Sequence, residues 1–129
     1  MPAGLSNVVA VSAGYGHSLA LRRDGTVIGW GNNWLGGATG TPTVAFPHHT
    51  TGAVMVAGQV LSNVVAISAG NDFSLGLKRD GTVVAWGHPN GMYIDVPAGL
   101  SNVVSIAAGY DFCLAITTNR FWAKPPTSN

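Results

Sequence analysis

The chain has 129 residues, 47% of them apolar, which is enough for one domain with a buried core and excludes a disordered, highly charged protein. Charged residues make up only 9% and the net charge is +1, so the basic stripe that binds nucleic acid is absent from the sequence. Eighteen glycines and few helix formers argue against an α-rich fold. This composition is more common in secreted or cell-surface proteins than in cytosolic enzymes.

Disulfides, cofactors and membrane spans are not expected. The single cysteine, Cys113, excludes an intrachain disulfide and makes a structural zinc cluster unexpected. No run approaches the roughly 18 apolar residues of a membrane span, and the first residues lack the features of a signal peptide. If the protein is exported, this chain is the mature part or a piece of a longer precursor. We expect no cofactor, no metal, and neither a membrane nor a nucleic acid as partner.

Residues 5–31 predict a small antiparallel sheet. The stretch "VVAVSAG" is rich in β-branched residues, and "HSLALR" alternates polar and apolar residues. Asp24-Gly25 is a strong hairpin signal, because glycine tolerates the positive φ that such turns need. The return stretch "TVIGWG" ends in Trp30-Gly31. We therefore predict three short strands joined by tight turns.

Residues 32–60 form a long connection rich in Gly, Thr and Pro. Within it, "GAVMVAG" is a candidate for a further strand. His48-His49 has no accompanying ligands at the spacing of a known metal site, so we interpret the pair as part of a solvated loop. In repeat proteins such insertions map to loops on one face, often the binding face.

The first unit is repeated twice more along the chain. "LSNVVAVSAG" at 5–14 recurs as "LSNVVAISAG" at 61–70 and as "LSNVVSIAAG" at 100–109, so the starts are 56 and then 39 residues apart. Such self-similarity predicts a solenoid or propeller whose units bury their faces against each other. We divide the chain into a first repeat with its insert (1–57), a second repeat (58–96) and a truncated third repeat with a tail (97–129).

These repeats resemble those of the regulator of chromosome condensation type. "VVAVSAGYGHSLALRRDGTVIGWGNNWLG" follows the family's order of apolar strand, Ala-Gly, His-Ser-Leu-Ala-Leu, Asp-Gly, apolar strand and Trp-Gly, and "VVAISAGNDFSLGLKRDGTVVAWG" follows it closely. The spacing of 39 residues and the joint "VPAGLSNVV" are similar to the compact bacterial repeats. The third copy departs from the pattern, because it lacks both Asp-Gly and Trp-Gly.

The resemblance implies a β-propeller, usually of seven four-stranded blades around a channel. It also implies functions as exchange factors for small GTPases, as chromatin-associated proteins or as binding surfaces, and one bacterial relative of the fold inhibits β-lactamases. This chain supplies only two full blades and an incomplete third. An open arc would expose apolar faces and strand edges. We therefore expect completion by homo-oligomerisation into a ring, most simply a dimer with about six blades.

No catalytic constellation is expected. His17, Phe73 and Phe112 share one repeat position, so a packing role suits all three, with the His17 ring bonded to nearby backbone. Cys113 lies in an apolar strand as a small buried hydrophobe. The positions that we assign to the repeat structure are Gly14, His17, Asp24, Gly25, Trp30, Gly31, Gly70, Phe73, Asp80, Gly81, Trp86, Gly87, Gly109 and Phe112.

The aromatic residues of the loops are the candidates for binding a partner. Exposed aromatic side chains on rigid loops anchor protein interfaces, although each could equally pack between blades. The candidates are Tyr15, Trp34, Phe46, Tyr93 and Tyr110. We predict a non-enzymatic propeller module that binds itself and an unknown protein. The alternatives are a structural fragment of a larger bacterial surface or secreted protein, or exchange-factor or enzyme-inhibitor activity by family analogy alone.

Overall fold

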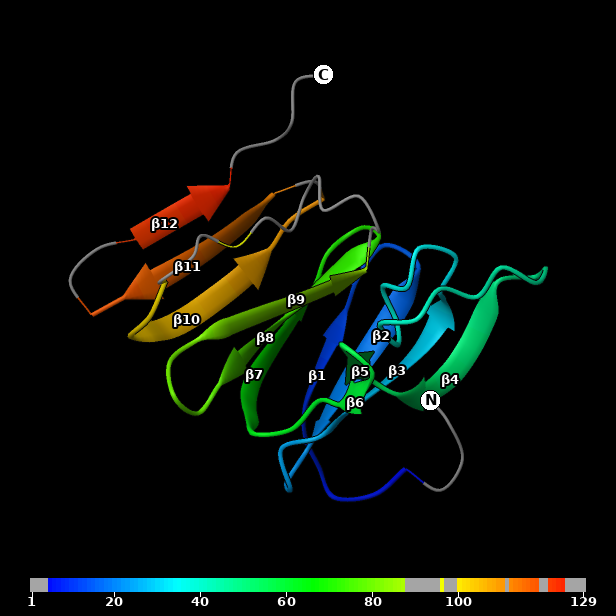
Figure 1. Cartoon of the computed structure of the whole chain (residues 1–129), viewed down its shortest axis with the longest axis horizontal. Coiled ribbons are helices and arrows are strands. Elements are labelled where there is room, and N and C mark those ends of the chain that lie inside the picture. Colours follow the sequence, from blue (N-terminus) through cyan, green and yellow to red (C-terminus); the bar gives the residue numbers. More distant parts are fainter. Residues whose placement is uncertain (1–4, 88–95, 97–99, 111, 119–120, 125–129) are drawn as a thin grey trace.

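The computed structural model describes residues 5–87, 96, 100–110, 112–118 and 121–124. These residues form four separate antiparallel sheets and no helix, and therefore no helix that could cross a membrane (Figure 1). The prediction of an all-β fold built from propeller-type blades is confirmed. Within the described part of the chain no sheet closes on itself.

The first blade is a four-stranded sheet in the order β1-β2-β3-β4. Its strands are β1 (Val8–Ala13), β2 (His17–Arg22), β3 (Val27–Asn32) and β4 (His49–Ala53). The fourth strand begins before the stretch "GAVMVAG" that we singled out, and that stretch is divided between β4 and a small hairpin. The hairpin pairs β5 (Met55–Val56) with β6 (Gln59–Val60) between the first and second blades.

The second and third blades each contribute three described strands in simple sequence order. They are β7 (Val64–Ala69), β8 (Phe73–Lys78) and β9 (Val83–Gly87), then β10 (Val103–Ala108), β11 (Cys113–Thr117) and β12 (Phe121–Lys124). The third blade keeps its β11–β12 hairpin without Asp-Gly, with Ile116 opposite Phe121. Loss of the turn motif therefore does not remove the strand that follows it.

The recurring "LSNVV" stretch leads into the first strand of every blade, which is β1, β7 or β10. We call this strand the inner strand. Asn7, Asn63 and Asn102 all have positive φ, of 57°, 61° and 57°. Asparagine is among the few residues that adopt this left-handed conformation readily. A register shift follows at the start of β1, β7 and β10. The repeated sequence thus gives the same left-handed asparagine and the same register shift at the start of all three inner strands.

The two Asp-Gly turns are held by their own side chains. Asp24 Oδ1 accepts hydrogen bonds from the Thr26 amide at 3.0 Å and the Thr26 hydroxyl at 2.6 Å. Asp80 accepts the same pair from Thr82, also at 3.0 and 2.6 Å. These hydrogen bonds, first that from the threonine hydroxyl, lower the pKa of both carboxyl groups. The structure therefore places both aspartates in turns and not in an acid–base pair.

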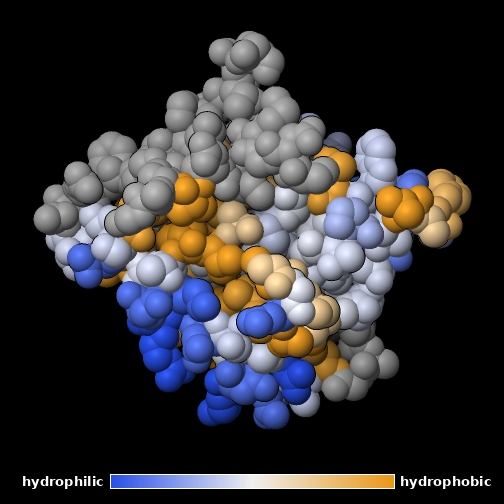
Figure 2. Space-filling view, in the orientation of Figure 1, coloured by the Kyte–Doolittle hydropathy of each residue, from blue (hydrophilic) through white to orange (hydrophobic). Residues whose placement is uncertain are grey.

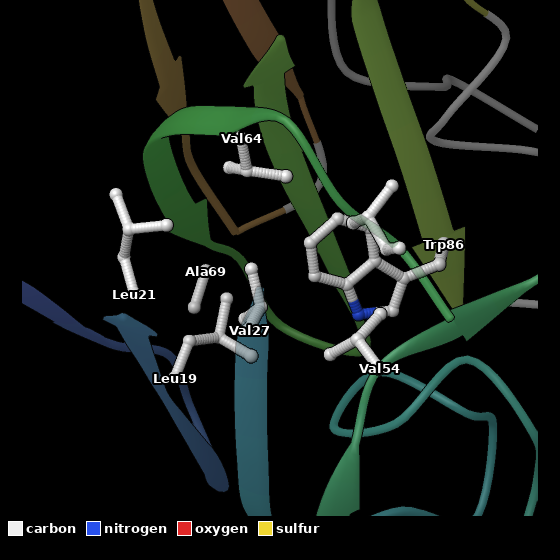
Figure 3. Packing of buried hydrophobic residues seen from close by; sticks show 8 residues of the cluster. Leu19, Leu21, Val27, Val54, Val64, Ala69 and Trp86 are labelled. Atoms are coloured by element: carbon white, nitrogen blue, oxygen red, sulfur yellow. The ribbon is translucent and has the colours of Figure 1, made fainter. Parts of the chain in front are cut away.

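The blades bury their faces against one another, in chain order (Figure 1). Between the first two blades, Leu19 and Leu21 of the first blade form one buried cluster with Val64, Ala69 and Trp86 of the second (Figure 3). Val54, from the long connection, and Leu61, the first residue of the second repeated stretch, belong to the same cluster. Between the second and third blades, Phe73, Leu75 and Cys113 form one cluster and Leu77, Val103 and Ala115 another.

Candidate interaction surfaces

The nearest approach to a catalytic pair is His17 and Ser74, and its geometry excludes an activated nucleophile. Ser74 Oγ donates to the carbonyl of Gly37 at 2.8 Å, so His17 Nε2, at 2.7 Å, must donate to Ser74. A serine activated by histidine would instead donate its proton to the ring. Both side chains are buried, and burial lowers the pKa of His17, an effect that Asp72 partly offsets.

This histidine therefore links three segments of the chain. Its ring joins the first blade to the second through Ser74, and the same hydroxyl fixes Gly37 of the insert. The ring is bonded to a side chain of the neighbouring blade, where we expected nearby backbone. Cys113 is fully buried against the second blade, and no group of three or more metal-ligating side chains occurs among the described residues.

Asn33, which sequence analysis did not single out, organises the insert. Its buried Nδ2 carries two hydrogens and lies 2.7–2.9 Å from three acceptors that share them, Thr39 Oγ1, Thr41 O and Thr43 Oγ1. Oδ1 accepts from the amides of Ala38 and Thr39 at 2.9 Å. The amide uses all its hydrogen-bonding capacity within one loop. The sequence offers little indication of this role, since Asn33 is marked only by being the second residue after Trp-Gly.

The loop held by Asn33 presents an aromatic cluster to solvent. The ring of His48 lies 5.7 Å from Trp34 and 5.8 Å from Phe46, between ring centroids. Trp34 is 57% exposed and Phe46 88% exposed, with Val44 beside them in the chain at 80%. The loop before β4 projects from the body, and Figure 2 shows hydrophobic atoms at that edge. We name Trp34, Val44, Phe46 and His48 the insert tip.

The loops that follow each Ala-Gly bring together two other candidates. Tyr15 and Tyr110 come from the first and third blades, yet their rings meet edge to face with centroids 5.8 Å apart. The Tyr15 amide also donates to Gly70 O of the second blade at 3.1 Å. The three inner strands thus end close to one another. Tyr93 lies outside the described residues.

The first blade has an open face that corresponds to a buried face of the second. Val11 is 62% exposed, whereas Ile67, at the same repeat position, packs against the first blade. Trp30 is half-buried, whereas its equivalent Trp86 is 3% exposed within the inter-blade cluster. In each repeat these positions lie on the side that faces the preceding blade, and in the first blade no described residue of another blade covers that side.

The third blade has the complementary open face. Leu114 and Ile116 are 38% and 51% exposed. Their equivalents in the second blade, Leu75 and Leu77, are 1% and 5% exposed because the third blade covers them. The described part of the chain therefore presents two apolar faces, one on the first blade and one on the third, and each is built from positions that are buried at the internal junctions.

Comparison with known proteins agrees with this architecture. Prp20p from Saccharomyces cerevisiae superposes with a TM-score of 0.74 at 24% identity, over 95% of this chain and 34% of that one. Human WBSCR16 superposes with a TM-score of 0.67 at 26% identity, over 87% and 32% of the two chains. The ectodomain of the receptor kinase CR4 from Physcomitrella patens gives 0.57 at 26%, over 90% and 30%. The chain spans about a third of the length of these structures.

No curated protein matches the chain significantly in sequence. The family model of the regulator of chromosome condensation (RCC1) repeat matches residues 8–33 and 64–92, which contain the first two blades up to Trp-Gly and beyond. The insert tip and the open face of the third blade lie outside these matches. The first two blades of the chain therefore contain segments that match the repeat of the RCC1 family.

Proposed function

We propose that the chain is a non-enzymatic protein-interaction module that assembles with copies of itself into a ring. The observation that supports this proposal is the pair of exposed apolar faces on the first and third blades. Leaving such apolar faces in water is unfavourable, and burying a valine, leucine or isoleucine contributes about 1.5–3 kcal/mol. A second copy offers the surfaces that already pack together inside each chain.

The contact that fits is head-to-tail. Leu114 and Ile116 of one copy would pack on Val11, Ile28 and Trp30 of the next, as Leu75 and Leu77 pack within the chain. Such a contact is heterologous and closes only if the rotation per chain divides a full turn. Two copies would give about six blades, within the range of known propellers. A dimer is therefore the simplest closed assembly.

Light scattering over a range of concentrations tests this assembly. We expect a discrete dimer that Val11→Asp or Ile116→Asp converts to monomer, because either change places a charge in an apolar junction. Both side chains are more than half exposed within the chain, so neither change should unfold it. Val44→Asp, at an exposed position of the insert, is the matched control and should leave the dimer intact.

Mixing the two monomeric variants tests the direction of the contact. The V11D variant keeps its third-blade face and the I116D variant keeps its first-blade face. A head-to-tail contact therefore predicts a 1:1 complex that does not grow further. A wild-type chain that stays monomeric at every concentration would contradict self-assembly and favour the alternative of a structural segment of a larger surface protein.

The insert tip supports a second binding role, toward another protein. Its aromatic residues are exposed on a loop that Asn33 holds in one conformation, which lowers the entropic cost of binding. Among the neighbours, Prp20p has been described with its binding properties to Gsp1p and histones, and Kap60 has been solved bound to yeast RCC1 (Prp20). Protein partners therefore suit the fold. No residue-specific feature supports exchange-factor or inhibitor activity.

A further inference from the structure

One hydrogen bond recurs at both internal blade junctions between the same repeat positions. The amide of Ala69 donates to Ser12 Oγ at 3.0 Å, and the amide of Ala108 donates to Ser68 Oγ at 2.9 Å. In each case a serine of the inner strand accepts from the inner strand of the following blade. This contact is polar and directional, so it adds specificity to the apolar packing around it.

A second hydrogen bond recurs at the start of each following inner strand. Val64 N donates to Gly25 O and Val103 N donates to Gly81 O, both at 3.0 Å. Each acceptor belongs to the Asp-Gly turn of the preceding blade. In the first blade, where Val8 is the residue equivalent to Val64 and Val103, a pocket of about 340 Å³ lies beside the Asp-Gly turn. It is lined by Asn7, Arg22, Arg23 and Asp24.

The third blade lacks a serine hydroxyl at the position of Ser12 and Ser68, so it has no acceptor for the amide of a following inner strand. Its inner strand reads Ser105-Ile106-Ala107, where the other two read Ala-x-Ser. The serine has therefore moved two residues along the strand, which is about 6.6 Å at 3.3 Å per residue and beyond hydrogen-bonding reach of the original donor. Both Ser105 and Ala107 are exposed on β10. The sequence also has no glycine at the turn between β11 and β12.

We infer that the junction between two copies is weaker than the junctions within each copy, and that Ala107 sets its strength. The inference rests on the proposed head-to-tail assembly. Apolar packing of Leu114 and Ile116 drives the contact, while the inner-strand amide of the incoming copy, at Ala13, meets a methyl group instead of a hydroxyl. The assembly therefore exchanges subunits while each chain stays folded.

Ala107→Ser tests this inference by restoring the acceptor. A hydrogen bond of ordinary net strength should tighten the dimer about two- to tenfold per junction. Sedimentation equilibrium measures the dissociation constant, and energy transfer between two labelled populations measures exchange, which should slow. Ser105→Ala is the matched control, since it changes the same face without supplying an acceptor at 107. Ser12→Ala removes an internal acceptor and should lower stability to unfolding rather than change the dissociation constant.

The outcomes separate this inference from the assembly itself. If I116D dissociates the dimer but A107S leaves both the dissociation constant and the exchange rate unchanged, Ala107 does not set the junction and the inference is wrong. If the wild type and A107S are both monomeric at every concentration, the proposed assembly fails together with the inference. A tighter A107S dimer with an unchanged S105A dimer supports both.

Discussion

The imidazole of His17 in the first blade donates a hydrogen bond to the hydroxyl of Ser74 in the second blade across 2.7 Å. The hydroxyl in turn holds Gly37 of the insert, so one buried chain of bonds joins two blades and a loop. Because burial lowers the pKa of this histidine, the folded state favours the neutral ring.

This relationship predicts a loss of stability in mild acid. Below the ordinary histidine pKa of about 6.5 the unfolded chain binds a proton that folded His17 resists, so the free energy of unfolding should fall as the pH drops from 7 to 5. The contribution of neutral His17 to the free energy of unfolding is fully present above about pH 6.5 and is lost as the pH falls below it. Urea unfolding at several pH values measures it.

His17→Phe provides the comparison, because phenylalanine occupies the equivalent position in the second blade, as Phe73. The variant should lose most of the pH dependence between 7 and 5. An unchanged pH dependence in the variant would mean that another group is responsible. His49→Gln, at an exposed position of β4, should keep the wild-type dependence.

Removal of the Asn33 amide should destabilise the insert. Asn33→Ala leaves the buried amides of Ala38 and Thr39 without their acceptor, so we expect a cost of about 2–4 kcal/mol in the free energy of unfolding. Urea unfolding and proteolysis within 34–48 measure the effect. Asn32→Ala is the control, because exposed Asn32 accepts one bond, from the Trp34 amide at 3.0 Å. Equal losses in both variants would contradict a special role for Asn33.

The two equivalent tryptophans should respond differently to truncation. Trp86→Ala removes the indole from the inter-blade cluster and should cost about 3–5 kcal/mol. Trp30→Ala should cost clearly less in the isolated chain, because no blade covers that side of the ring. In the dimer the Trp30 variant should weaken association instead. Thermal unfolding of the isolated chain and sedimentation of the dimer separate the two effects.

Substitution of the insert tip should leave folding and assembly intact. Trp34→Ser and Phe46→Ser together should change the free energy of unfolding by no more than about 0.5 kcal/mol per site, since both rings are largely exposed. The dimer should persist, while binding of any protein partner at this loop should weaken. Pull-down with the wild type and the double variant in parallel measures the difference. A large loss of stability would show instead that the rings are packing residues.

The repeats were predictable because each one satisfies local rules on its own. Asp24-Gly25 and Asp80-Gly81 signal their turns through residue type, and "LSNVV" needs its asparagine for a left-handed backbone. The family pattern then indicated blades. What joins the blades was not predictable, because Ser12 and Ala69 or His17 and Ser74 are 57 residues apart. The Asn33 network was missed for a related reason: its partners are ordinary threonines whose role appears only when the loop is folded.

The glycine that directly follows each inner strand has a consequence for the circumference of any closed ring. A Cβ added at Gly14 would overlap the carbonyl oxygen of Gly70, and one added at Gly70 would lie 2.7 Å from the carbonyl oxygen of Gly109. These contacts lie at the narrow edge of each wedge-shaped blade. A methyl group there would push the narrow edges apart while the wide edges stayed in place, and so reduce the angle from one blade to the next. The absence of a side chain at these glycines thus helps to determine how many blades complete a closed ring.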